Sequence, residues 1–265
     1  MNYIYLFPIL GIIISYCYST SDKFKYYTKY IIYSFVCIVV SIIVLIVSIG
    51  RPRNVKNAML SCILGQVASP LIGIEWEING SENVPKDEAC IIMANHQSAL
   101  DILGMFHLWP YFRSATAVAK KELVYFVPFG PCLYASGLLL IPRSQSEKSK
   151  KILNDAVEVF KKENTHIWLF PEGTRRSDGQ IHEFKKGGFH MALSAHLPIL
   201  PVVYGAYDFI NHKEKRFDSG KQVINILPPI STKGKSIEDL DALIKETRSK
   251  MIENYNEINN TKLNL

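Results

Sequence analysis

Two windows without any charged residue, 1–21 and 30–50, lie at the amino-terminal end of the chain. At a rise of about 1.5 Å per residue, either window as a helix is long enough for the roughly 30 Å hydrocarbon core of a bilayer. Pro8 and Gly11 interrupt the first window, whereas the second is rich in Ile and Val. A cleaved signal peptide fits the first window poorly, because no basic residue precedes its apolar run. The pattern predicts a hydrophobic two-helix membrane anchor over residues 1–50, ahead of a second domain over residues 51–265.

From residue 51 onward, short apolar runs alternate with amphipathic segments. Segments 146–163 and 237–255 have apolar residues at helical spacing, and Ser236 and Asp239 are spaced as a capping box. Strands that alternate with helices are typical of an α/β domain with a largely parallel sheet flanked by helices. Seven apolar runs are predicted to be the strands: 73–78, 90–94, 115–119, 138–141, 166–170, 199–204 and 223–227.

A third uncharged segment, 123–142, lies inside the second domain and is long enough to be considered as another membrane span. It contains Pro128, Gly130, Pro131 and Gly137, which break a straight helix. We therefore expect an apolar wall of the domain here, with a third span as the less favoured alternative.

Charge and cysteine content restrict the class of protein. The chain has 30 Lys and Arg against 24 Asp and Glu, a formal net charge of +6, which suits an anionic substrate or an anionic membrane surface. The basic residues are scattered and no nucleic-acid-binding motif accompanies them, so nucleic acid is not an expected partner. The 5 cysteines contain no CxxC pair, which argues against a disulfide framework or a zinc site and favours thiols in a reducing compartment.

The first group of residues that can carry chemistry is Asn95-His96-Gln97-Ser98-Ala99-Leu100-Asp101, directly after a predicted strand. We expect an apolar helix to follow, with Asp101 about one turn into it. A His at a strand end and an Asp across the turn can form a pair in which the His removes a proton and the carboxylate fixes its tautomer. A surface His beside an Asp favoured by the helix dipole is the alternative interpretation.

The second group is Phe170-Pro171-Glu172-Gly173-Thr174-Arg175-Arg176, which begins at the last residue of the predicted strand 166–170. Gly173 lets the chain turn closely, and arginine offers a planar fork for phosphate oxygens. We expect Glu172 to orient that arginine or a substrate hydroxyl rather than to bind a metal. The alternative is a polar turn with a solvated ion pair.

Taken in chain order, these segments resemble the motifs of the glycerolipid acyltransferases, the family defined by HxxxxD and EGTR. The segments are NHQSALD, KKEL, GLLLIPR, FPEGTRR, FKKGGF and LPILPVVY. The similarity is closer to the eukaryotic 1-acylglycerol-3-phosphate acyltransferases, and it extends through the flanking RPRNV and RFDSG segments.

The resemblance implies a role for each matching residue. His96 would be the general base on the acceptor's hydroxyl, oriented by Asp101, and Pro201 would belong to a block that shapes the acyl-CoA or acyl-chain site. Pro142 departs from the commonest pattern, in which Asp or Asn precedes the arginine, and this removes a polar partner beside that arginine. The acceptor's glycerol phosphate would be held by the EGTR block and nearby basic residues: Glu172, Gly173, Thr174, Arg175, Arg143, Lys120 and Lys185.

The resemblance further implies acyl-CoA as co-substrate, lysophosphatidic acid as acceptor, and a lipid bilayer as partner, with no cofactor and no metal. Segment 123–142 would face the acyl chain. Another lysophospholipid or glycerol 3-phosphate is the alternative acceptor. A non-catalytic acyl-CoA-binding or lysolipid-binding protein is disfavoured by the intact His–Asp pair, and a lipid hydrolase by the missing G-x-S-x-G elbow.

The family resemblance implies the endoplasmic reticulum membrane, with the catalytic domain facing the cytosol. The positive-inside rule is nearly balanced between the two ends of the second window, so a two-span hairpin and a hairpin within one leaflet both stay open. The residues concerned are Lys23, Lys25 and Lys29, expected in a short loop between the two apolar helices, and Arg51, Arg53 and Lys56.

Overall fold

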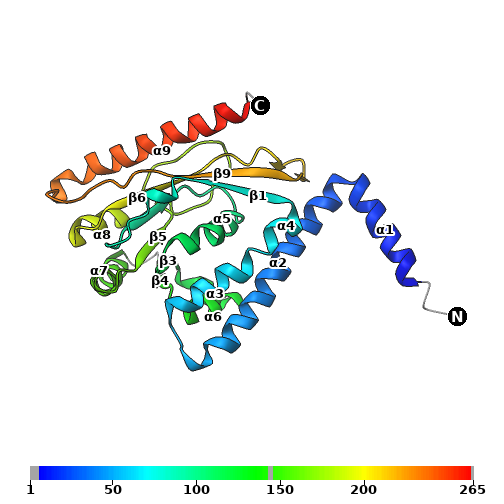
Figure 1. Ribbon diagram of the computed structural model, residues 1–265, viewed down its shortest axis with the longest axis horizontal. Helices are drawn as coiled ribbons and strands as arrows, with labels where there is room; N and C mark the ends of the chain where they lie inside the picture. Colours follow the sequence, from blue (N-terminus) through cyan, green and yellow to red (C-terminus); the bar gives the residue numbers. More distant parts are fainter. Residues whose placement is uncertain (1–5, 143–145, 264–265) are drawn as a thin grey trace.

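The computed structural model describes residues 6–142 and 146–263, which are built around one seven-stranded sheet (Figure 1). Each predicted apolar run forms one strand of this sheet, and the differences from the prediction lie only at strand ends. The strands are β1 (Ile74–Asn79), β2 (Ile91–Ala94), β3 (Ala115–Lys120), β4 (Leu139–Ile141), β5 (His166–Leu169), β6 (Ile199–Tyr204) and β9 (Gly220–Ile226). Two short strands, β7 (Ile210–Asn211) and β8 (Arg216–Phe217), form a separate hairpin.

The strands lie in the order β1-β9-β6-β2-β5-β3-β4. All neighbours pair in parallel except β6 and β9, so β1 and β9 run opposite to the other strands. The predicted α/β class with a largely parallel sheet is thus confirmed. Every residue of the central strands β2 and β5 is buried.

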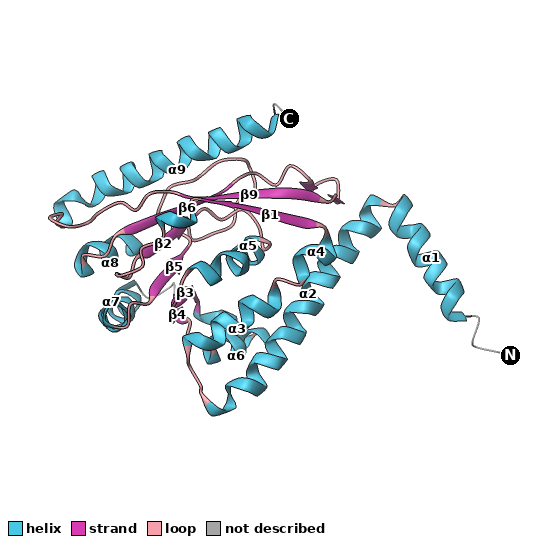
Figure 2. Ribbon diagram, viewed as in Figure 1, coloured by secondary structure: helices cyan, strands magenta, loops and turns pink. Residues whose placement is uncertain are grey.

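Helices cover both faces of the sheet, because successive strand residues point to opposite sides. In β2, Ile92 and Ala94 belong to the apolar core shared with α2, α3 and α5, whereas Ile91 and Met93 belong to the core shared with α7, α8 and α9 (Figure 2). The predicted helices at 146–163 and 237–255 and the Ser236–Asp239 capping box are present. The helices are α2 (Asp22–Val47), α3 (Val55–Gly65), α4 (Ala68–Ile72), α5 (Asp101–Leu108), α7 (Ser146–Lys162), α8 (Gly187–Ala195) and α9 (Leu240–Leu263).

The amino-terminal segment contains two helices, α1 (Leu6–Thr20) and α2, but the expected loop with three lysines is wrong. Lys23, Lys25 and Lys29 lie in the first turns of α2, because Ser21 caps that helix by accepting the Phe24 N–H. By length and apolar composition, Asp22–Gly50 and Val55–Ile72 are the segments long enough to cross a membrane within the described part of the chain, and α1 is shorter.

Helix α2 packs directly on the α/β domain. Its residues Val36, Val40 and Val44 are buried in the same core as Ile92 of β2. The division at residue 50 into an anchor and a catalytic domain remains a prediction, and one face of the anchor is also part of the domain's core.

Segment 123–142 is not a continuous helix. It is divided among the 3-10 helix η5 (Lys121–Tyr125), α6 (Phe129–Ala135) and β4. The interpretation of this segment as an apolar wall of the domain is therefore confirmed, and the third span is excluded.

Candidate active site

The loops that follow β2 and β5 meet at one edge of the sheet, because the two strands pair in parallel. The loop after β2 carries His96, and the loop after β5 carries Glu172. The His96 N–H donates to Glu172 Oε1 at 2.9 Å, and the Arg176 N–H donates to the His96 carbonyl oxygen at 3.0 Å. The two motifs, which are distant in sequence, therefore form a single site.

His96 and Asp101 form a hydrogen-bonded pair, with 2.7 Å between His96 Nδ1 and Asp101 Oδ2. Asp101 is the first residue of α5 rather than one turn into a helix, since the helix begins later than expected. The His96 ring stacks on the Phe170 ring with 3.9 Å between the ring centroids. With Nδ1 bound to the carboxylate, Nε2 is the ring nitrogen positioned to take a proton from a substrate.

Three further donors hold the Asp101 carboxylate, whose side chain is fully buried. The Gln97 and Ser98 N–H groups donate to Oδ2 at 2.7 and 2.9 Å, and the Tyr207 hydroxyl donates to Oδ1 at 2.9 Å. Burial, with the nearby Asp101 charge, raises the pKa of Tyr207 well above its ordinary value, so the phenol stays protonated as a donor. Sequence reasoning missed Tyr207, because no local pattern links it to Asp101.

The Glu172 carboxylate accepts hydrogen bonds from the main chain of two separate segments. Its Oε1 accepts from His96 N–H, and its Oε2 accepts from His182 N–H at 3.1 Å. The side chain is buried, and hydrogen bonds from main-chain N–H groups to a buried carboxylate are strong. Glu172 thus fastens the loop after β2 to the segment around His182. That it also orients the neighbouring arginine or a substrate hydroxyl stays a prediction.

Gly173 makes the turn that follows. Its φ of 73° lies in the left-handed region, and a Cβ at this position would lie 2.8 Å from Lys185 Cε. Any other residue would be strained here and would displace the lysine.

Helix α9 fixes two of the loops around the pair. Arg248 Nε donates to the His182 carbonyl at 2.9 Å, and Arg248 Nη2 donates to the Ile181 carbonyl at 2.7 Å. Asn259 Oδ1 accepts from the Ala206 N–H at 2.9 Å, one residue before Tyr207. No sequence signal marked either side chain.

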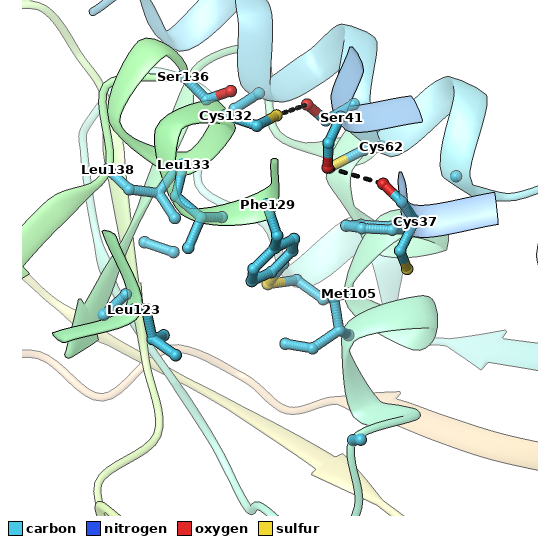
Figure 3. Close-up of a pocket in the computed structure, with 18 of the residues that line it drawn as sticks. Cys37, Ser41, Cys62, Met105, Leu123, Phe129, Cys132, Leu133, Ser136 and Leu138 are labelled. Atoms are coloured by element: carbon cyan, nitrogen blue, oxygen red, sulfur yellow. Dashed lines mark hydrogen bonds between the residues drawn. The ribbon is translucent and has the colours of Figure 1, made fainter. Parts of the chain in front are cut away.

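A cavity of about 640 Å³ lies beside His96 and has the size and apolar lining typical of a small-molecule site. Its polar end is formed by His96, Lys120, Thr174 and Arg175, and the exposed Lys120 and Arg175 show that this end opens to the surface. Side chains of α2, α3, α5 and α6 form much of the remaining lining, which is largely apolar but includes Ser41, Ser61 and Ser136. Figure 3 shows Leu123, Leu133 and Leu138 on one wall, facing Met105, Cys37 and Cys62 on the other.

The described residues contain no group of three or more His, Cys, Asp or Glu side chains that is arranged to hold a metal ion. The chemistry supported by the geometry is proton transfer at His96 next to a largely apolar cavity.

Comparison with known proteins places this geometry in a family. The Acyltransferase family model matches residues 75–205. The mouse 1-acyl-sn-glycerol-3-phosphate acyltransferase alpha is 33% identical to this chain over 240 residues, which cover 90% of this chain and 84% of the mouse protein. The human alpha protein is 31% identical over 239 residues, which again cover 90% of this chain and 84% of the relative. This chain belongs to the 1-acyl-sn-glycerol-3-phosphate acyltransferase family. The crystal structure of the 1-acyl-sn-glycerophosphate (LPA) acyltransferase PlsC from Thermotoga maritima has the same fold, with a TM-score of 0.62 and 26% identity over 87% of this chain and 95% of that one.

The acyltransferase motifs converge on the cavity in large part. His96, Lys120, Gly173, Thr174 and Arg175 all line it. The exposed Lys185 side chain packs against Gly173, at the edge of the same site. Pro201 is buried in β6 beside Met93, within the sheet rather than on the described cavity wall. Arg143 lies outside the described residues.

Proposed function

We propose that this acyltransferase moves a fatty acyl group from acyl-CoA to the sn-2 hydroxyl of lysophosphatidic acid, giving phosphatidic acid. The observation that carries the proposal is the His96–Asp101 pair at the open, basic end of a cavity whose other walls are largely apolar. The apolar part suits an acyl chain, and the basic end suits a phosphate. The names of the mouse and human relatives are consistent with this acceptor.

The proposed reaction needs only proton transfer and positioning. His96 Nε2 takes the proton of the acceptor hydroxyl as its oxygen attacks the thioester carbonyl carbon, and Asp101 stabilises the imidazolium that results. The tetrahedral intermediate collapses with cleavage of the C–S bond, and the proton held by His96 passes to the departing CoA sulfur. The thioester is already activated, so no cofactor is required beyond acyl-CoA as co-substrate.

In the proposed substrate binding, basic side chains attract the acceptor's phosphate and other residues of the site position the loop around it. Arg175 and Lys120 would attract the acceptor's phosphate, with Lys185 and Arg143 adding positive charge nearby. Glu172 and Gly173 would act mainly by positioning, since Glu172 accepts main-chain N–H groups and Gly173 makes the turn. Thr174 would contribute its hydroxyl at the cavity entrance.

A membrane setting completes the proposal. A lysolipid acceptor resides in a bilayer, and α1 and α2 present many exposed apolar side chains. We place the enzyme on the endoplasmic reticulum membrane with the catalytic domain facing the cytosol, where acyl-CoA is available.

The test uses membranes that contain the full chain, labelled oleoyl-CoA and a panel of lysolipids. The expected product is labelled phosphatidic acid from lysophosphatidic acid, and His96→Ala is expected to lower the initial rate by about 10²–10⁴-fold at matched protein level. His190→Ala, a half-buried histidine in α8, is the control and should retain the wild-type rate. Labelled free fatty acid as the main product, or a His96→Ala rate close to wild type, would contradict the proposal.

A further inference from the structure

The turn between η5 and α6 exposes three consecutive large apolar side chains, which we call the rim loop, Tyr125–Phe126–Val127. Their exposed fractions are 76%, 65% and 79%. Isolated exposed apolar residues are ordinary on protein surfaces, but a contiguous patch marks an interaction site.

The rim loop is held in a defined position. The Val127 N–H donates to the Tyr125 carbonyl at 3.2 Å, and the Gly130 N–H donates to the Phe126 carbonyl at 2.6 Å. At its other end, α6 is fastened to the segment around α3, because the Ala135 carbonyl accepts from the Asn54 N–H at 3.1 Å and from Asn57 Nδ2 at 2.9 Å. The exposed side chains therefore project from a rigid support.

The loop borders the candidate active site. Leu123 before it and Phe129 after it both line the cavity, and Lys120 at the cavity's open end lies just upstream. Whatever contacts the rim loop is consequently placed beside the entrance to the site.

The charges next to the loop favour an anionic lipid surface. Lys120 and Lys121 are exposed, and Glu122, which lies 4.0 Å from the Lys120 ammonium, is the acidic side chain between them and the apolar residues. Tyr and Phe beside lysines are typical of the membrane–water interface, where aromatic rings enter the acyl boundary and ammonium groups contact head groups.

We propose that the rim loop inserts into the interfacial region of an anionic phospholipid bilayer, as a membrane contact separate from α1 and α2. In this position the entrance of the cavity lies at the depth of the head groups, where a lysolipid can enter directly from the leaflet. Only the entry of a lysolipid rests on the proposed function. The insertion itself is inferred from the exposure of the rim loop, its composition and the hydrogen bonds that hold its backbone.

The first experiment measures insertion without any use of activity. A Phe126→Cys variant, with Cys17 and Cys37 changed to Ser, is labelled with the fluorophore NBD and bound to vesicles of phosphatidylcholine and phosphatidylserine. We expect blue-shifted NBD emission and quenching by lipids with a spin label near the head group. The matched control is Ile237→Cys, because Ile237 is 58% exposed and lies in the 3-10 helix η6 (Ile237–Asp239), directly before α9. Figure 1 shows that the beginning of α9 is distant from α2 and α6. NBD emission typical of water at residue 126, with quenching by aqueous iodide, would overturn the proposal. Blue-shifted emission without quenching by the spin-labelled lipids would overturn it as well, because it would show that protein rather than lipid covers the loop.

The second experiment separates insertion from chemistry. Phe126→Asp should raise the apparent KM for long-chain lysophosphatidic acid in vesicles about tenfold or more, because it removes an apolar side chain from the interface. The same variant should use a short-chain, monomeric lysophosphatidic acid at the wild-type rate, and Ile237→Asp should match wild type on both. Equal KM values in vesicles for wild type and Phe126→Asp would also overturn the proposal. If the wild-type chain makes no phosphatidic acid, the proposed function fails, and the NBD measurement still decides whether the loop inserts.

Discussion

The Asp101 carboxylate receives four hydrogen bonds while its side chain has no exposed surface. The donors are His96 Nδ1, the Gln97 and Ser98 N–H groups, and the Tyr207 hydroxyl. The donors compensate for the loss of water around a buried charge, and the same contacts fix the orientation of the His96 ring. The Asp101 side chain thereby both stabilises the loop after β2 and orients His96, which we propose as the general base.

Asp101→Asn tests the charge at nearly constant shape. The amide oxygen can take the place of Oδ2 and accept from His96, Gln97 and Ser98, while the new NH2 group faces the Tyr207 oxygen, which can accept a hydrogen bond. We therefore expect an intact loop, a fall in kcat of about 10²–10⁴-fold and little change in KM for the acceptor, because only the support for the imidazolium is lost. Steady-state kinetics with varied lysophosphatidic acid measure both quantities. A change confined to KM would show that Asp101 binds substrate instead.

His166 provides a prediction on stability at a residue outside the site. It is buried in β5, its Nδ1 accepts the Cys90 N–H at 3.2 Å, and burial lowers its pKa to about 4. The unfolded chain, with a histidine pKa near 6.5, binds a proton that the folded chain rejects. Stability is therefore complete above pH 6.5 and is lost as the pH falls toward 4. This effect should remove about 2 kcal/mol between pH 7 and pH 5.

The measurement is the denaturant midpoint of the purified protein at the two pH values, compared with His166→Asn. The asparagine amide oxygen can replace Nδ1 as acceptor but does not titrate, so the variant should lose less stability on acidification than wild type. Identical losses in the two proteins would show that His166 is not the acid-sensitive group.

At the scale of elements, α9 lies outside the segment matched by the family model and yet supports the site. Arg248 holds the carbonyls of Ile181 and His182, the His182 N–H binds Glu172, and Glu172 binds the His96 N–H. This series of hydrogen bonds connects α9 to the main chain of the proposed base. Arg248 is thus a positioning residue, since it does not line the cavity.

Arg248→Gln should lower kcat of the folded enzyme about tenfold with a smaller effect on KM, because charged hydrogen bonds to two carbonyls are lost and the loop that orients His96 is loosened. Arg248→Lys retains one charged donor and should recover part of the rate. Lys250→Gln is the matched control, because Lys250 is exposed on the same helix and forms an ion pair with Glu246, one turn away. A variant with reduced thermal stability but unchanged kcat would show that Arg248 is structural alone.

The sheet was predictable from sequence because each strand is a short apolar run bounded by polar or turn residues. His96, Asp101 and the EGTR block were predictable because each lies in a continuous motif that directly follows a strand. Tyr207 and Arg248 were not, since their contacts depend on how β6 and α9 pack in three dimensions. The hydrogen bonds of Glu172 were not predictable for a related reason: its partners are main-chain N–H groups, which no side-chain pattern reveals.

At the scale of the whole molecule, α2 has two faces with different surroundings. Near its beginning, Tyr26 OH hydrogen-bonds His212 Nδ1 at 2.9 Å and Lys25 Nζ lies 3.8 Å from Asp218, and further along Tyr33 OH donates to the Ala99 carbonyl at 3.1 Å. The other face exposes large apolar side chains, among them Ile31, Phe35, Ile42 and Ile46. Of the three lysines expected in a loop, Lys25 and Lys29 thus lie on the side of α2 that docks to the α/β domain, and Lys23 is exposed.

Two arrangements of α1 and α2 are compared: a hairpin within one leaflet, and two straight membrane spans. The contacts of α2 favour the hairpin, within the leaflet that faces the catalytic domain. A helix whose polar first turns and one whole face are bound to the domain cannot be surrounded by lipid along its length, whereas its apolar face can lie in one leaflet. Both basic groups, Lys23 and Lys25 in α2 and Arg51 and Arg53 after it, then remain within reach of anionic head groups on one side. The topology prediction follows from the helix contacts and not from apolar length alone.

The topology is measurable with a Lys245→Cys variant in sealed microsomes, with Cys17 and Cys37 changed to Ser. Lys245 is exposed on α9, so an impermeant maleimide should label it without detergent if the catalytic domain faces the cytosol. A second variant is Ile12→Cys, at an exposed apolar position of α1. This cysteine is expected to lie in lipid, so the maleimide should label it poorly in sealed microsomes and also in microsomes that are opened without dissolving the bilayer. Full protection of residue 245 until the vesicles are opened would place the domain in the lumen. Labelling of residue 12 only from the lumenal side would instead show that α2 crosses the bilayer and that α1 lies on the lumenal side.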